Sequence, residues 1–372
     1  MTRPLQLRLR SLAKTGFAAG LDWTQLGSLV GSWRGLKGMP LVVGYHRVVR
    51  DFDRSDSLSI SPMLTSARTF EQHLDWIGRR YRFVSLDELA VTLENGETNG
   101  KPVAAITFDD GYRDVYQNAF PILKRRGIPS AVFVVTNLIG TNRLQVHDEL
   151  HLLLSAMLEQ PCASREGRWR DLVASLELTD RLSERLTRRL VNANEPFRAT
   201  RVLLETLNRA AIERFLDALR GRFRFQEDEL RRFRMLDWDM LAEMIAGGMT
   251  VGSHTRSHAL LANETPQVLR DEIEGSRREL EQRLGVPIRH FAYPDGRFNA
   301  SAIQAVADAG YRSAYTICAH RDRAHPLLTI SRRMLWENAC MNWFGRFSPA
   351  ILSCQVNGIF DPAGTCRTQH WA

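Results

Sequence analysis

The chain has 372 residues, of which 44% are hydrophobic and 25% are charged. This is the composition of an ordinary globular protein, and it excludes a disordered or fibrous chain. The formal net charge of +8 is compatible with an anionic neighbour. Since no recognition helix or basic strand with interleaved aromatic residues is evident, we expect no nucleic-acid partner. The five cysteines are widely spaced and form no CxxC pair, which favours a reducing compartment over a disulfide scaffold.

Residues 1–38 form a basic segment whose apolar residues are interrupted by arginine. The segment lacks the continuous apolar stretch of a signal peptide, and no run of about 18 apolar residues occurs anywhere, so we expect no transmembrane helix. The pattern is typical of a helix that is solvated or docked on the core, and the alternative is an amphipathic helix on an anionic membrane. We therefore expect a cytoplasmic protein, with peripheral membrane contact through this segment as the alternative.

The first half of the chain alternates apolar runs with amphipathic stretches. Strands are expected at 41–43, 103–108 and 131–135. A helix capped by Thr69, with His73 on its surface, lies between the first two strands. Another helix begins near Asp114 and ends at Gly127. Since a strand, a helix and a strand follow one another within so few residues, the strands on either side of this second helix should be parallel.

The same alternation returns after Met235. Strands are expected at 249–251, 289–293 and 312–317, and helices begin at the caps Asp237, Thr265 and Asn299. Residues 147–234, by contrast, are rich in leucine and arginine and nearly free of strand signals, which predicts a helical insertion. The charged stretch that contains Arg185, Arg188 and Arg189 is expected to be a solvated helix face.

These patterns predict an α/β protein. We divide it into a basic N-terminal helical segment (1–38), the first part of the α/β domain (39–146), a helical insertion (147–234), the second part of the α/β domain (235–335) and a C-terminal extension (336–372).

The most informative segment is an aspartate pair. Asp109 and Asp110 come directly after a buried strand, and Gly111 and Tyr112 follow them. Two adjacent carboxylates repel each other, which destabilises the fold unless something compensates their charge. In parallel α/β domains, active sites lie at the carboxyl ends of the strands. By themselves, the two residues could also be a capping aspartate and a turn aspartate before a glycine.

A histidine pair completes the pattern. His254 and His258 also follow a short strand, and histidines four residues apart can point at one metal ion. Together with one aspartate they make a set of oxygen and nitrogen ligands that leaves positions open for water and substrate. The second aspartate is then free to act as a base.

In this order, the two segments resemble the motifs of the polysaccharide deacetylase family, also called the NodB homology domain or carbohydrate esterase family 4. The resemblance extends over about residues 41–333 and implies a distorted (β/α) barrel with fewer than eight strands. It implies that Asp110, His254 and His258 are ligands of a divalent metal, which is usually Zn²⁺ in relatives. It also implies that Asp109 is the catalytic base.

Residues 291–296 resemble the family's third motif, in which the backbone N–H of Asp295 would bind the oxyanion. This motif departs from the family pattern, because Ala292 stands where many members have an arginine that orients the base. Either Arg332 or Arg333 could replace it from another strand. The late motif that supplies the general acid in relatives is not evident either, since His320 and His325 lie in that region without its sequence context.

Two other histidine segments carry weaker signals. His46 ends a strand and resembles the Tyr-His segment of exopolysaccharide-type relatives, so it lies either at the pocket or as a satisfied histidine at a strand end. His147 and His151 form another pair with carboxylates between them, but Glu149 is not where an HExxH motif requires it. We expect this second pair to be an ordinary polar helix face.

The resemblance implies a hydrolase that removes N-acetyl groups from a polysaccharide or glycolipid sugar and releases acetate, in exopolysaccharide or glycolipid metabolism. Two alternatives stay open. One is an amide hydrolase of the same fold that acts on a small molecule. The other is a metal- and glycan-binding protein without catalysis, which the altered third motif and the missing late histidine favour.

Overall fold

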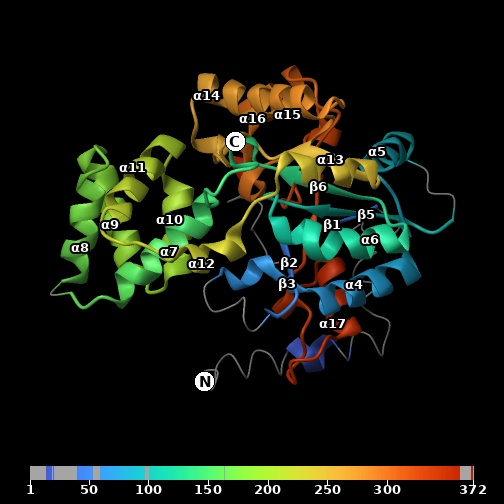
Figure 1. Cartoon of the computed structure of the whole chain (residues 1–372), viewed down its shortest axis with the longest axis horizontal. Coiled ribbons are helices and arrows are strands. Elements are labelled where there is room, and N and C mark those ends of the chain that lie inside the picture. The colour runs from blue at the N-terminus through green and yellow to red at the C-terminus, as the bar shows by residue number, and fades with distance from the viewer. Residues whose placement is uncertain are drawn as a thin grey trace.

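The computed structural model describes residues 14–18, 20, 40–52, 59–96, 100–162, 164–360 and 370–371. Its centre is a sheet of parallel strands that curls into a barrel, with helices around it and a further group of helices at one side (Figure 1). The strand order along the sheet is β11-β10-β8-β7-β6-β5-β1-β12. These strands are β1 (Leu41–Tyr45), β5 (Val103–Phe108), β6 (Ser130–Val134), β7 (Met249–Ser253), β8 (His290–Ala292), β10 (Ser313–Thr316), β11 (Ile330–Ser331) and β12 (Arg333–Met334).

The predicted strands are confirmed within a residue or two, and β5 and β6 are parallel as expected. Shorter strands pair at the margins: β4 (Arg82–Phe83) with β5, β2 (Arg47–Val49) with β3 (Leu64–Ser66), and β9 (Phe298–Asn299) with β13 (His370–Trp371).

The barrel closes through one short segment of the chain. β11 pairs with β10, and after a single intervening residue, Arg332, β12 pairs with β1. The segment 330–334 therefore bridges the two edges of the sheet, and the ring has seven positions. This arrangement confirms the predicted α/β fold, a distorted (β/α) barrel. The expectation of fewer than eight strands is not met, since eight strands in the described part of the chain form the ring and the two short ones, β11 and β12, share one position.

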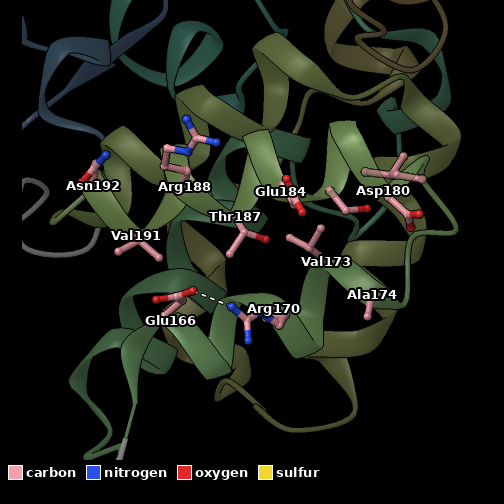
Figure 2. A pocket seen from close by; sticks show the side chains of 12 residues that line it. Glu166, Arg170, Val173, Ala174, Asp180, Glu184, Thr187, Arg188, Val191 and Asn192 are labelled. Carbon is pink, nitrogen blue, oxygen red and sulfur yellow. Dashed lines mark hydrogen bonds and ion pairs between the residues drawn. The ribbon is translucent and has the colours of Figure 1, made fainter.

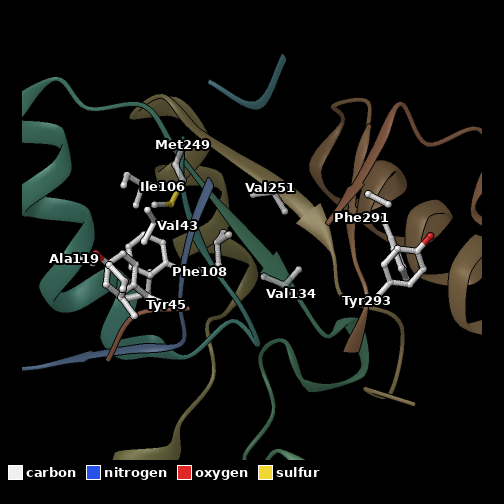
Figure 3. Packing of buried hydrophobic residues seen from close by; sticks show 14 of the residues in the cluster. Val43, Tyr45, Ile106, Phe108, Ala119, Val134, Met249, Val251, Phe291 and Tyr293 are labelled. Atoms are coloured by element: carbon white, nitrogen blue, oxygen red, sulfur yellow. The ribbon is translucent and has the colours of Figure 1, made fainter. Parts of the chain in front are cut away.

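Successive residues of each strand face opposite sides of the barrel wall. Ile106 and Phe108 of β5 belong to the large apolar cluster between the strands and the surrounding helices, part of which Figure 3 shows. Ala105 of β5 and Phe133 of β6 belong to a second cluster that fills the barrel. With both faces covered, the strands are buried throughout, as is usual for parallel sheets.

Helices cover the outside of the barrel. They are α4 (Ala67–Arg80), α5 (Leu86–Asn95), α6 (Phe120–Arg126), α13 (Trp238–Ala246), α14 (Pro266–Arg270), α15 (Ser276–Leu284) and α16 (Ala300–Asp308), with one-turn π segments at Val115–Ala119 and Asp271–Gly275. The caps predicted at Asp237, Thr265 and Asn299 are confirmed, because each side chain accepts a backbone N–H of the first turn. The cap predicted at Thr69 is wrong. Ser66 caps α4, and its hydroxyl accepts the N–H of Thr69 itself.

The surface position predicted for His73 is also wrong. The side chain is completely buried, and its Nδ1 lies 3.1 Å from the Tyr45 hydroxyl. Its ring stacks against that of Tyr45. Burial lowers the pKa of His73 to about 3, so the imidazole is neutral and forms part of the packing between α4 and β1.

The segment predicted to be a helical insertion contains α7 (Val146–Glu159), α8 (Arg165–Ala174), α9 (Asp180–Asn192), α10 (Pro196–Thr206), α11 (Arg209–Arg220) and α12 (Glu227–Leu230). These helices stand beside the barrel, with α8 and α9 farthest from it (Figure 1). They enclose an apolar cluster of their own, in which Trp169 is completely buried. We therefore propose that the insertion packs around its own apolar core, separate from that of the barrel.

A hollow lies between α8 and α9, on the outer side of the insertion (Figure 2). An ion pair along α8 joins Glu166 and Arg170 at 2.6 Å on its wall, and Arg188 also lines it. Arg185 and Arg188 are exposed, as predicted for a solvated face, whereas Arg189 is half-buried and pairs with another helix. None of the residues that line the hollow is a histidine, so it does not carry the predicted chemistry.

Most of the basic segment 1–38 lies outside the described residues, so its predicted membrane contact stays a prediction. The described part is helical at residues 14–18. There Ala18 packs against Ile351 and Cys354 of α17 (Pro349–Val356), and the Lys14 ammonium donates to the backbone oxygen of Ala339 at 2.6 Å. Within the described ranges, none of the helices combines the length and hydropathy needed to span a bilayer.

Candidate active site

The carboxyl ends of the barrel strands bring the predicted site residues together. His46 directly follows β1, Asp109 and Asp110 follow β5, His254 follows β7, and Arg332 follows β11. All five residues line one cavity of about 220 Å³, which we call the site pocket. Because parallel strands all point in the same direction, residues far apart in the sequence meet at this edge of the barrel.

Three imidazoles surround the carboxylate of Asp110. The Nε2 atoms of His258 and His254 lie 3.3 and 3.7 Å from Oδ1 of Asp110, and Nε2 of His147 lies 3.7 Å from Oδ2. The ligand atoms of Asp110, His147 and His258 all lie within 4.8 Å of one another. Among the described residues, Oδ2 of Asp110 is buried without a hydrogen-bond partner. Such a set of oxygen and nitrogen donors fits a divalent cation.

The orientation of His254 is fixed by a backbone contact. Its Nδ1 lies 2.8 Å from the carbonyl oxygen of Ala292, and a carbonyl can only accept a hydrogen bond. Nδ1 therefore carries the proton, which leaves the lone pair of Nε2 facing Asp110. Gln145 acts on the carboxylate in a similar way, because its Nε2 donates to Oδ1 of Asp110 at 3.2 Å. Contacts of this kind orient metal-binding side chains in proteins.

The structure corrects the interpretation of His147. We predicted a polar helix face, but His147 is buried and lines the site pocket. The cause is the docking of α7 onto the aspartate motif: the Tyr112 hydroxyl donates to Asp148 Oδ2 at 2.5 Å and lies 2.8 Å from His147 Nε2. His151, the other member of the pair, is half-buried and does not line the site pocket, so only one of the two histidines belongs to the site.

Asp109 is held by a buried ion pair. The two terminal nitrogens of Arg332 donate to the two carboxylate oxygens of Asp109, each at 2.7 Å. Asp109 is 4% exposed and Arg332 is 2% exposed, so water screens this pair very little. Of the two arginines that could replace the one missing at Ala292, the structure places Arg332 on the aspartate, while Arg333 does not line the site pocket.

The electrostatic surroundings shift the pKa values of the two aspartates in opposite directions. Burial raises the pKa of Asp109, but the charge and hydrogen bonds of Arg332 outweigh it, and the net pKa lies below the ordinary value of 3.8. The pKa of Asp110 lies well above that value, first because of burial and then because of the neighbouring charge of Asp109. Asp109 is therefore the ionised member, and Asp110 requires a cation to become charged.

The histidines of the site are neutral near pH 7. Burial lowers the pKa of His46 to about 4, lowers that of His147 to about 3, and lowers those of His254 and His258 as well. A neutral imidazole has a lone pair to offer, so this state is the one that a metal ligand needs.

The backbone around the pocket is strained. Five non-glycine residues in the described part of the chain have a positive φ, and four of them belong to the motifs at this edge: Asp110 (72°), Thr255 (69°), His258 (58°) and Asp295 (55°). Such conformations are unfavourable for residues with a side chain and tend to persist at functional sites. Gly111 also has a positive φ of 80°, and a Cβ there would lie 3.0 Å from Val134.

The third motif also reaches the pocket. Asp295 lies in the loop after β8, and its carboxylate is ion-paired with Arg201 and, at 3.2 Å, with Arg297. Asp295 and Gly296 both line the site pocket, so the backbone of this loop faces the place where a substrate would bind. By contrast, the structure does not bring His320 or His325 to the pocket, and His320 is exposed on the surface.

The fold and the site define a (β/α) barrel that can hold a divalent cation beside an ionised carboxylate. The model of the polysaccharide deacetylase family matches residues 96–165 and 196–314, which together are more than half of the chain. The chain therefore belongs to the polysaccharide deacetylase family.

Individual relatives match over shorter stretches. A poly-beta-1,6-N-acetyl-D-glucosamine N-deacetylase of Staphylococcus epidermidis is 30% identical over 132 residues, which cover 33% of this chain and 44% of the relative. An enzyme of the same name from Staphylococcus aureus is 31% identical over 108 residues, which cover 27% of this chain and 37% of the relative. The matched part thus spans less than half the length of these curated relatives.

Solved structures match nearly the whole fold. The deacetylase PplD of Streptococcus pyogenes, solved in complex with acetate, gives a TM-score of 0.52 at 20% identity, covering 85% of this chain and 97% of that one. IcaB from Ammonifex degensii gives a TM-score of 0.51 at 19% identity, covering 86% and 97%. At these identities the likeness shows a shared fold.

Proposed function

We propose that this chain is a divalent-metal-dependent deacetylase that hydrolyses the N-acetyl group of a sugar in a polysaccharide or glycolipid and releases acetate. The observation that carries the proposal is the pair of unlike aspartates: Asp109, kept ionised by Arg332, lies next to Asp110 and its three imidazoles. The named activity of the staphylococcal relatives makes a β-1,6-linked N-acetylglucosamine polymer the first substrate to test. The cytoplasmic or membrane-peripheral location stays a prediction from the sequence.

We assign the metal to Asp110, His254 and His258, with Zn²⁺ as the expected ion. The unpartnered Oδ2 of Asp110 and the fixed tautomer of His254 support this assignment. When bound, such an ion supplies Lewis-acid polarisation of the acetyl carbonyl. His147 lies at the same distance from Asp110 as His254 does. Because the Tyr112 hydroxyl donates to Asp148, the Nε2 of His147 donates to that hydroxyl, and we assign His147 the role of positioning the ligands.

The remaining steps use side chains of the pocket. Asp109 accepts a proton from the attacking water, which it can do because it is ionised at neutral pH. The backbone N–H of Asp295 donates to the oxyanion of the tetrahedral intermediate. The sugar nitrogen must gain a proton before it leaves. His46 lies in the pocket and is neutral, so it would take this proton from Asp109 and pass it on.

The experiment is acetate release from N-acetylglucosamine oligomers by the Zn²⁺-loaded protein. We expect release by the natural chain, and we expect Asp109→Asn to bind Zn²⁺ with unchanged stoichiometry while turnover falls by about 10²–10⁴-fold, the usual contribution of a general base. Near-normal turnover of Asp109→Asn would contradict the role of this residue. Release from small amides but from no glycan would favour the small-molecule hydrolase instead.

A protein that binds metal and glycan without catalysis was favoured by the missing arginine of the third motif. The Arg332–Asp109 pair weakens that alternative, because the carboxylate is oriented and charged from a different strand. Metal binding and glycan binding without any acetate release would restore it.

A further inference from the structure

One wall of the site pocket comes from the insertion. α10 contributes Phe197, Thr200, Arg201 and Leu204 to the lining, and their spacing of three, four and seven residues places them on one face of that helix. The rest of the lining comes from the barrel and its loops, including Trp336, and from His147 of α7. The helical insertion is thus part of the substrate-binding cavity.

The opposite face of α10 anchors this wall. Ala199 and Leu203 are completely buried in the apolar cluster of the insertion. The end of the helix is tied to the barrel side, since the Asn263 amide donates to the backbone oxygen of Leu207 at 3.0 Å. Packing on one face and a hydrogen bond at the end hold the wall in a fixed position.

An ion-pair network joins α10 to the loop that carries Asp295. Arg201 pairs with Asp295 and, at 3.1 Å, with Glu205 of the same helix. Arg297, in the same loop as Asp295, contacts both acidic residues, Glu205 at 2.9 Å and Asp295 at 3.2 Å. Arg297 is 7% exposed, so part of this network is shielded from water. The wall and the loop with the proposed oxyanion donor therefore form one connected unit.

The resulting pocket is small, and apolar side chains form part of its lining. Its volume of about 220 Å³ is below the roughly 300–1,000 Å³ of sites for drug-sized ligands. Phe197 lies on its wall and is still 37% exposed, although it is a large apolar side chain. An exposed aromatic ring beside a polar centre suits a ligand with both an apolar face and hydroxyl groups, and a pyranose ring has both.

We propose that α10 is the substrate-selecting wall of this enzyme, and that it restricts the pocket to a single N-acetylated sugar at the end of a glycan, with the sugar ring against Phe197. This inference rests on the proposed deacetylase function and names the position in the glycan at which it acts. An internal residue would need an open groove that continues on both sides of the pocket. Because α10 lines the pocket, we infer that it closes one of these two sides.

The test locates the acetyl group that is lost. The Zn²⁺-loaded protein is given β-1,6-linked N-acetylglucosamine pentamers, and tandem mass spectrometry of the singly deacetylated product identifies the residue. We expect a terminal residue in the natural chain. Arg201→Ala should raise the share of internal deacetylation several-fold, because the wall loses its direct ion pair with Asp295 and keeps only the contact between Glu205 and Arg297. Arg189→Ala is the matched control, since Arg189 also pairs with Glu205, at 2.9 Å, but does not line the pocket.

A second pair of variants tests the sugar platform. Phe197→Ala should raise KM for the pentamer about tenfold, the size of one moderate binding contact. Phe344→Ala removes another exposed phenylalanine, which lies outside the pocket lining, and should leave KM unchanged. Equal deacetylation at all five positions, or an unchanged KM in Phe197→Ala, would overturn the inference and leave the deacetylase function intact. Absence of acetate release from every glycan would instead overturn the function, and the inference with it.

Discussion

Replacing Arg332 by methionine tests how the chain keeps its base charged. Methionine replaces the unbranched stem of the arginine side chain and has no charge, so the packing around the stem is kept while Asp109 loses both hydrogen bonds of 2.7 Å. Removing one partner of a buried ion pair leaves the other charge without compensation, which costs about 3–5 kcal/mol of stability. We expect a loss of this size in urea unfolding at neutral pH.

The sign of the pH dependence follows from the pKa of Asp109. In the natural chain this pKa is depressed, so the pair stabilises the fold above the ordinary value of 3.8 and the contribution is lost as the pH falls through the folded pKa. Without Arg332, burial remains and raises the pKa of Asp109 above that of the paired state. The acidic limb of the kcat/KM profile should therefore move to higher pH.

Arg333→Met is the matched control, because it removes the next arginine of the same segment, which does not line the site pocket. Its acidic limb should stay in place. If Arg332→Met loses activity while its acidic limb stays where it is in the natural chain, the charge of Arg332 does not tune Asp109, and the reasoning fails.

Three further predictions concern the metal and the barrel. His147→Ala should lower Zn²⁺ affinity by about 10–100-fold in a competition titration, as for a residue that orients ligands; complete loss of binding would make it a ligand. Zn²⁺ affinity should rise with pH, because the raised pKa of Asp110 means that the ion must displace a proton, and a flat profile would contradict this. Gly252→Ala should cost about 1–3 kcal/mol in urea unfolding, since the added Cβ would lie 2.6 Å from the ring of Phe133. Gly167→Ala, where the nearest side-chain atom is 3.4 Å away, is its control and should not destabilise the protein.

The parts of the fold that depend on residues close together in the sequence could be predicted from the sequence. β5 has the bounds that its apolar run indicates, and Gly127 ends the following helix in a left-handed conformation. The cap of α4 is Ser66, three residues before the predicted Thr69, because both residue types can cap a helix and the sequence alone does not distinguish them. The carboxylate of Glu337, far along the chain, accepts hydrogen bonds from both residues.

The same distinction, between local sequence patterns and contacts of residues far apart in the chain, applies to the site. Asp109, Asp110, His254 and His258 are recognisable because their order and spacing form a pattern within short segments. His147 carries no such pattern, since a histidine followed by two acidic residues in the first turn of a helix is usually solvated. Its burial depends on Tyr112, which lies 35 residues earlier and draws α7 onto the aspartates. The α10 wall was equally hidden, because an amphipathic helix does not reveal which partner each of its faces meets.

The position of Arg332 between β11 and β12 ties chemistry to the completion of the ring. The guanidinium reaches Asp109 from the single residue that separates the two edge pairings. A chain in which residues 330–334 have not yet paired with β10 and β1 would have no positive charge beside Asp109. Partly folded forms should accordingly be inactive toward glycans. In the folded protein, transient loss of the pairing of residues 330–334 would move Arg332 away from Asp109 and interrupt catalysis.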